Sequence, residues 1–201
     1  MDAGRAAAYR WAVTAPTGQF RFGPDTGRLV LRTTRAGVAA KAGHDLTMEI
    51  TSWSARADVP AEDAGGLAAA TITAKADLGS LAVREGTGGA RPLTDSDRGE
   101  IEKNARRILA RGGRGTAVFA SSRVIPGAAG GAIEGTLTLH GQAQPVRLQV
   151  TGPAPGRYRG AGTVLQTRFG IRPYTALLGA LKLRDEVSLE FEVDLGEAVR
   201  A

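Results

Sequence analysis

The residues of this chain best suited to acid–base chemistry are its two histidines and one histidine–aspartate neighbour. His44 precedes Asp45, and His140 precedes Gly141. Adjacent side chains of a strand point to opposite faces, so His44 and Asp45 cannot easily touch if both lie in one strand. At a strand entrance His44 could instead face the headgroup of a ligand. The simpler interpretation of both histidines is a structural hydrogen bond in a loop or turn, and we favour it.

The sequence excludes several other chemistries. It has no cysteine, which excludes disulfides, thiolate catalysis, iron–sulfur clusters and cysteine-based zinc sites. Two histidines are too few for a three-histidine metal site, and neither HxH nor HExxH spacing occurs. No Gly-x-Ser-x-Gly nucleophile motif is present, and the glycines at 86–89 lack the Gly-Lys-Ser/Thr of a phosphate-binding loop. We therefore expect neither a metal nor another cofactor.

Basic residues concentrate in one segment of the chain. The net charge is +6, from 26 Lys and Arg against 20 Asp and Glu. Between Arg98 and Arg114, six basic residues stand against two acidic ones, which is most of the net charge. Such a face could attract a pyrophosphate headgroup or an anionic membrane surface, but a solvated helix exterior explains it more simply. No aromatic residue is interleaved with these charges, which argues against nucleic-acid binding.

The elements that must position these residues are mainly strands. Apolar and polar residues alternate with a period of two, which predicts strands with one buried side, paired antiparallel around a single interior. A change of parity at Thr51 and Ser52 predicts a β-bulge. About eight such strands can close into a barrel that holds one small ligand. They cover residues 28–34, 46–59, 70–78, 117–121, 133–140, 146–151, 158–168 and 187–195.

Two segments interrupt this β pattern. The spacing of Ile101, Ala105 and Ile108 predicts one amphipathic helix over about 95–111. Thr94 and Asp97 predict a capping box at its start. An apolar segment near 173–181 predicts a short helix or turn.

Three stretches of the chain resemble one known family. Residues 135–146 read GTLTLHGQAQPV, similar to a strand–turn–strand signature of the YceI-like family of polyisoprenoid-binding proteins. Phe169-Gly170-Ile171 followed by Asp185-Glu186-Val187 resembles the family's closing motifs, and Phe119-Ala120-Ser121 resembles its strand after the helix. The order of strands and helix also fits. The resemblance covers a core of about residues 29–195, within a single predicted domain over 1–201.

The resemblance implies an eight-stranded, antiparallel, lipocalin-like barrel with an elongated apolar cavity. It implies that the cavity holds a long-chain isoprenoid or a similar amphiphile, and it implies no catalytic residues. His44 and Arg168 are the candidate contacts for a ligand headgroup. The candidate cavity-lining residues are Met48, Ile50, Ile72, Phe119, Leu137, Leu139, Leu148 and Phe191.

Small residues at inward positions favour a cavity over a filled core. They leave volume that something else must occupy, because protein interiors are otherwise close-packed. A helix folded over one barrel end could fill that volume instead. The small inward residues are Ala70, Ala74, Ala76, Gly135, Gly160 and Gly162.

The leading hypothesis is therefore a non-enzymatic protein that binds, stores or transports an isoprenoid or similar amphipathic lipid. The first alternative is an enzyme acting on a hydrophobic substrate, with His44 and Asp45 at the cavity mouth. The second is a solidly packed barrel that binds a partner protein. No signal peptide or transmembrane segment is evident, which predicts a cytoplasmic protein without stable membrane insertion. A homodimer is compatible with such a barrel.

Overall fold

The computed structural model describes residues 17–110, 115–127, 130–154, 156–195 and 199–200. Within these ranges the chain forms thirteen strands, one α-helix and several single turns of 3-10 helix. Every strand pairing is antiparallel. The strands are β1 (Gly18–Phe22), β2 (Gly27–Ala36), β3 (Asp45–Ile50), β4 (Trp53–Val59), β5 (Thr71–Asp77), β6 (Leu81–Thr87), β7 (Thr116–Gly127), β8 (Gly130–Leu139), β9 (Gln142–Ala154), β10 (Arg157–Leu165), β11 (Thr175–Ala176), β12 (Leu181–Asp194) and β13 (Val199–Arg200).

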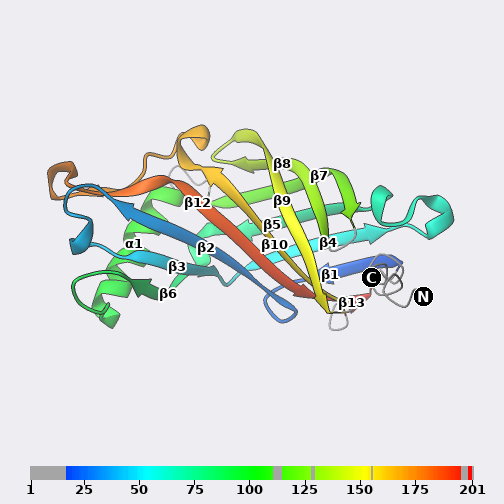
Figure 1. Cartoon of the computed structure of the whole chain (residues 1–201), viewed down its shortest axis with the longest axis horizontal. Helices are drawn as coiled ribbons and strands as arrows, with labels where there is room; N and C mark the ends of the chain where they lie inside the picture. Colours follow the sequence, from blue (N-terminus) through cyan, green and yellow to red (C-terminus); the bar gives the residue numbers. More distant parts are fainter. Residues whose placement is uncertain (1–16, 111–114, 128–129, 155, 196–198, 201) are drawn as a thin grey trace, which may run out of the picture.

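The sheet curls into a wall that returns to its starting point (Figure 1). Its pairing order is β13-β1-β4-β5-β7-β8-β9-β10-β12-β2-β3-β6, and β11 pairs with β12. Strand β2 pairs with both β12 and β3. Two residues then carry the chain from β3 into β4, which pairs with β5. The wall therefore encloses an interior, and the predicted class of a mainly β, antiparallel, lipocalin-like barrel is confirmed.

The prediction of eight strands was wrong. The predicted run 46–59 is broken into β3 and β4, and the sequence pattern missed the additional strands β1, β6, β11 and β13. Thr51 and Ser52 interrupt the run from β3 to β4, at the position where the sequence pattern changes parity. A 3-10 turn, η4 (Leu78–Ser80), interrupts the run from β5 to β6 opposite them. Ser80 holds the two breaks together, since its carbonyl oxygen accepts from the Thr51 hydroxyl at 2.8 Å and its own hydroxyl accepts from the Ser52 amide at 2.9 Å.

The single α-helix of the described chain is α1 (Asp95–Leu109), as predicted, and the predicted end at residue 111 lies outside the described residues. The predicted capping box is confirmed: the Thr94 hydroxyl accepts from the Asp97 amide, and the Asp97 carboxylate accepts from the Thr94 amide. The apolar stripe of the helix packs on the buried core at one end of the barrel. At the predicted short helix or turn near 173–181, the structure has β11 followed by a 3-10 turn, η7 (Leu177–Gly179).

Side chains of α1 cover the edge of β6, whose one partner strand among the described residues is β3. Glu102 accepts a hydrogen bond from the Val83 amide at 2.8 Å. Arg106 donates to the Leu81 carbonyl oxygen at 3.0 Å, and Arg98 donates to that of Arg84 at 2.7 Å. Two arginines of the basic segment thus satisfy backbone groups that an edge strand would otherwise leave unpaired. This structural use of two of the basic residues was not predicted from the sequence.

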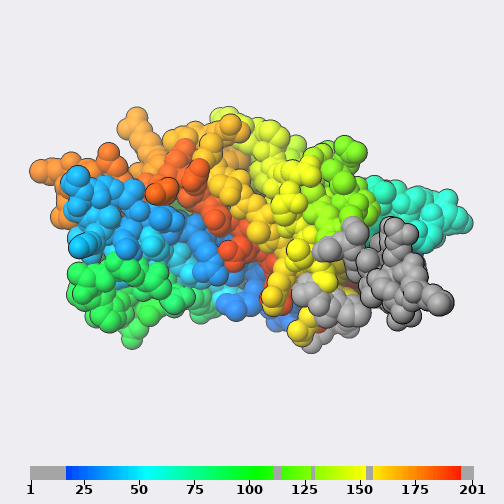
Figure 2. Space-filling view, viewed as in Figure 1, coloured from blue at the N-terminus to red at the C-terminus, as the bar shows by residue number. Residues whose placement is uncertain are grey.

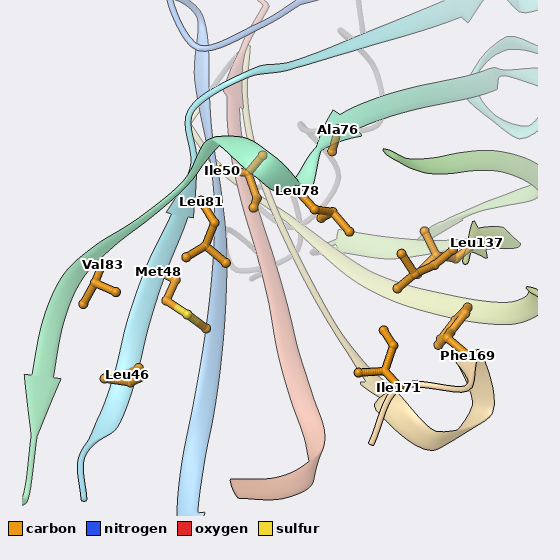
Figure 3. Packing of buried hydrophobic residues seen from close by; sticks show 11 residues of the cluster. Leu46, Met48, Ile50, Ala76, Leu78, Leu81, Val83, Leu137, Phe169 and Ile171 are labelled. Carbon is orange, nitrogen blue, oxygen red and sulfur yellow. The ribbon is translucent and has the colours of Figure 1, made fainter. Parts of the chain in front are cut away.

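The larger core cluster fills the barrel end that α1 covers, which we call the closed end (Figure 3). Leu81 and Ile50 are each 1% exposed there. A second, smaller cluster, centred on Phe20, lies under β1 and β4. The buried residues of the closed end are Leu46, Met48, Ile50, Ala76, Leu78, Leu81, Val83, Leu137, Leu139, Phe169 and Ile171. No helix of the described residues is long and apolar enough to cross a membrane.

Candidate functional site

A cavity of about 250 Å³ occupies the other half of the barrel interior, which we call the open end. It is enclosed by β4, β5, β7, β8, β9 and the last part of β12, and it is partly open to solvent. Its lining reaches Pro126, Gly152 and Leu195, which lie close to the strand ends on the side away from α1. The interior is therefore filled at one end and hollow at the other.

Alanines on three neighbouring strands keep this half hollow. Inward positions of β4 hold Ala55 and Ala57, those of β5 hold Ala74 and Ala76, and β7 contributes Ala117. These residues also face one another across the pairing, as Ala55 with Ala74 and Ala76 with Ala117. A methyl group is too short to reach the opposite side of the barrel. The alanine side chains of these three strands therefore leave the space in front of them unfilled.

The inward glycines Gly160 and Gly135 do not create the free volume in the cavity that their small size had suggested; each makes room for an aromatic ring. A Cβ atom at Gly160 would overlap the ring of Phe191, and one at Gly135 would overlap the ring of Phe119. Both rings line the cavity, and each lies against a glycine of a neighbouring strand. The volume that these glycines leave is therefore occupied by aromatic rings lying along the wall. The free volume comes from the alanines.

A floor separates the cavity from the packed core of the closed end. Its residues line the cavity and also belong to, or pack against, the closed-end cluster. They come from β2, β4, β5, β7, β8 and β9. The floor is formed by Leu29, Trp53, Ala76, Ala117, Phe119, Leu137 and Val146.

The structure divides the predicted lining residues between the two ends. Three of them, Met48, Ile50 and Leu139, lie in the packed cluster of the closed end, outside the cavity lining. They face inward as predicted, but on strand segments next to α1. Those that line the cavity are Ile72, Phe119, Leu137, Leu148 and Phe191. Trp53 also lines the cavity and was not among the predicted lining residues. It lies in the predicted strand 46–59, where it continues the alternation that Met48 and Ile50 begin, after the change of parity at residues 51–52.

The cavity lining is almost free of polar side chains. Among the lining residues, the side chains with polar atoms are those of Lys75, Thr151, Trp53 and Tyr158. Lys75 and Thr151 are exposed, at outward positions of their strands. Burial raises the pKa of Tyr158 above its ordinary value, so its phenol stays neutral at physiological pH. The cavity thus presents hydrocarbon, with no ionised side chain of a lining residue directed into it.

His44 and Asp45 lie at the closed end and bind separate partners. The His44 Nε2 donates to the carbonyl oxygen of Arg91 at 2.7 Å, in the loop before α1. The Asp45 carboxylate accepts from the Arg35 amide at 2.8 Å. Neither residue lines the cavity. His44 therefore makes the structural loop hydrogen bond that the sequence favoured over a role at the cavity mouth.

The remaining polar candidates also lie away from the cavity. His140 donates through Nε2 to the carbonyl oxygen of Leu109 at 2.6 Å, where α1 ends. Arg168 is exposed in a 3-10 turn, η6 (Gln166–Phe169), and its carbonyl oxygen accepts from the Gln144 amide group at 3.1 Å. Its neighbour Phe169 is buried in the closed-end cluster. Among the described residues, no three His, Asp or Glu side chains gather as metal ligands.

The YceI-like domain matches residues 29–195 of the chain. No curated protein matches it.

Three solved structures share the fold at low sequence identity. BcnA from Burkholderia cenocepacia is 16% identical with a TM-score of 0.58, over 83% of this chain and 94% of BcnA. A polyisoprenoid-binding domain from Saccharophagus degradans, implicated in plant cell wall breakdown, is 14% identical with a TM-score of 0.51, over 89% of this chain and 99% of that domain. The Campylobacter jejuni YceI protein is 14% identical with a TM-score of 0.52, over 77% of this chain and 85% of that protein.

Proposed function

The chain belongs to the YceI-like family, and on that premise we propose that its cavity binds the hydrocarbon part of an isoprenoid or similar amphipathic lipid. The single observation that carries this proposal is the hollow, uncharged interior of the open end. The related domain from Saccharophagus degradans is described as polyisoprenoid-binding, which supports the same class of ligand. The proposed contacts include Ile72, Phe119, Leu148 and Phe191.

The size of the cavity bears on how much of the lipid it takes. Its volume of about 250 Å³ is below the roughly 300–1,000 Å³ of typical small-molecule pockets. A long chain therefore places one segment inside, and its polar headgroup stays at the open mouth. Each buried methylene contributes about 0.8 kcal/mol, and ordering a flexible chain cancels part of this gain. Binding by apolar burial alone discriminates weakly between isoprenoids and other hydrocarbon chains.

We propose storage or transport of the lipid without chemical conversion. The alternative of an enzyme requires an acid–base pair beside the substrate. His44 and Asp45 are each bound to other partners at the closed end, and the floor of the cavity separates them from the lipid. Hydrogen bonds to a loop carbonyl and a backbone amide support structural roles for both residues.

The test is direct binding of prenyl alcohols to delipidated protein, measured by native mass spectrometry with geraniol, farnesol and geranylgeraniol. Ala74→Leu extends an inward side chain into the cavity, whereas Thr73→Leu adds a similar group at the neighbouring exposed position. We expect roughly a tenfold or greater loss of farnesol affinity for Ala74→Leu. Thr73→Leu should bind as the unmodified protein does. Equal affinity of the two variants, or no binding by any form, would overturn the proposal.

A further inference from the structure

An exposed apolar tip projects from the closed end of the molecule. The tip consists of residues 37–43, after β2, and 172–184, which include β11, η7 and the start of β12. The two segments, blue and dark orange in Figure 2, lie side by side at one end of the molecule. The Ala39 amide joins them by donating to the Ala180 carbonyl oxygen at 3.0 Å.

Exposed large apolar side chains of the described residues gather at this tip. Val38 is 97% exposed, Leu177 60% and Leu178 110%, and Tyr174 beside them is 37% exposed. The one comparable residue elsewhere in the described chain is Val118, 44% exposed on β7. Single apolar residues scattered over a surface are ordinary, whereas an exposed apolar group confined to one place marks a site of interaction.

The backbone holds the two leucines outward in a conformation that leucine rarely adopts. Leu177 and Leu178 have φ angles of 51° and 55°, consecutive positions in the left-handed region. Side chains with a Cβ atom are disfavoured there. The turn is nevertheless fixed, since the Ala180 amide donates to the Leu177 carbonyl oxygen at 3.0 Å and the Leu183 amide donates to that of Tyr174 at 3.0 Å. Such strain, kept in an exposed turn, points to a function.

Basic residues surround these apolar side chains. The tip contains Lys41, Arg172, Lys182 and Arg184, and neither of its segments has an acidic residue. All four basic side chains are exposed, and none has an ion-pair partner within the described part of the chain. Of the acidic residues next to the tip, the Asp45 and Asp185 carboxylates are bound by Arg35 and Thr167, respectively, and Glu186 is exposed two residues beyond Arg184. The four basic residues of the tip outnumber it. The tip is therefore apolar at its centre and positively charged around it.

We propose that this tip docks on the surface of an anionic lipid bilayer. The leucines and Val38 enter the boundary between headgroups and acyl chains, and Tyr174 lies at headgroup level. The four basic residues face the anionic headgroups. The docking is shallow and reversible, because only four side chains in two short segments supply the apolar area.

This docking orients the whole barrel. The tip lies at the beginning of β12 and the end of β2, whereas Leu189, Phe191 and Leu29, farther along the same two strands, line the cavity. The cavity mouth therefore faces away from the bilayer, and the tip acts as a tether. The proposal does not depend on what the cavity binds.

The test is co-flotation with vesicles of phosphatidylcholine, with or without one fifth phosphatidylglycerol. The unmodified protein should float with the anionic vesicles and much less with the neutral ones. The double variant Leu177→Ser/Leu178→Ser should lose roughly tenfold or more of this binding, and Lys41→Glu/Lys182→Glu should lose the preference for anionic vesicles. Val118→Ser, which removes an exposed apolar side chain outside the tip, should bind as the unmodified protein does.

Two further measurements test whether the leucine variant is folded and whether the tip binds a second copy of the chain. Thermal unfolding and farnesol binding show whether the double leucine variant is folded; if it is not, the two glutamate substitutions provide the same test. Size-exclusion chromatography across a concentration series detects pairing of two copies through the tip. Vesicle binding that the leucine and charge variants leave unchanged would overturn the proposal. So would the absence of binding to anionic vesicles, whether or not the tip instead forms a dimer that the leucine variant dissociates.

Discussion

The closed and open ends of the barrel use the same alternation of residues with opposite results. At the closed end the inward positions hold Leu46, Met48, Ile50 and Leu81, whose side chains meet one another (Figure 3) and belong to the cluster against which the apolar stripe of α1 packs. At the open end many inward positions of β4, β5 and β7 hold alanine, and a cavity remains. The comparison shows that alternation selects which side chains face inward, whereas their size decides whether the interior is filled.

The largest expected effect is on stability, from a cavity created at the closed end. Leu81→Ala removes a side chain that is 1% exposed and packed in the core. We expect a loss of about 2–5 kcal/mol in the free energy of unfolding, measured by urea denaturation. Farnesol affinity at low temperature should change by less than about twofold, because the site lies beyond the floor. A large loss of affinity in a folded variant would show that the two ends are not independent.

A smaller effect is expected at the open end, where a glycine accommodates an aromatic ring. Gly160→Ala forces the Phe191 ring off its neighbouring strand and toward the cavity. We expect about 1–3 kcal/mol of destabilisation, together with weaker farnesol binding. Gly152→Ala is the matched control, because the nearest atom to its Cβ is 3.7 Å away. If the two substitutions behave alike, the rings do not depend on the glycines for their position.

The smallest effect is expected at the start of α1, which covers the closed end. Thr94→Ala removes the helix cap and should cost about 1 kcal/mol. The Arg91 guanidinium and the Thr94 amide and hydroxyl hold the pKa of Asp97 well below its ordinary value. The stability that this carboxylate gives is therefore present above the pKa of an unfolded aspartate, near 4, and is lost as the pH falls below it.

Asp97→Asn tests the pH dependence of this cap. Urea denaturation of the variant and of the unmodified protein at several pH values from 7 to 2 measures the difference in stability. That difference should be largest at neutral pH and should shrink as the solution becomes acidic. A constant difference over this range would mean that the charge of Asp97 contributes nothing. Farnesol affinity should not change, because α1 does not line the cavity.

The sequence was most informative where a structure depends on local rules. The capping box of α1 follows from Thr94 and Asp97 alone. The parity change at residues 51–52, predicted as a β-bulge, marks a break between β3 and β4. Both features involve neighbours in the sequence. The mainly β, antiparallel character followed in the same way, from a period of two that each strand carries by itself, whereas the lipocalin-like form came from the family resemblance.

The location of the cavity could not be read from the same pattern. Met48 and Ile50 alternate as regularly as Ala55 and Ala57, but α1 covers only the first pair. Which barrel end a helix covers depends on contacts between distant segments, such as Arg106 with the Leu81 carbonyl oxygen. The glycines illustrate the same limit, because the rings that occupy their space come from neighbouring strands.

The way in which α1 covers β6 has a consequence for how this protein fails under stress. Three long side chains of the helix, and no partner strand, occupy the outer backbone groups of β6. A helix that packs through one stripe can detach before the sheet melts. Its departure would leave amide and carbonyl groups free to recruit a strand from another chain. Aggregation on heating should therefore begin at the contact between α1 and β6. Substitutions that strengthen the packing of α1 on β6 should delay it.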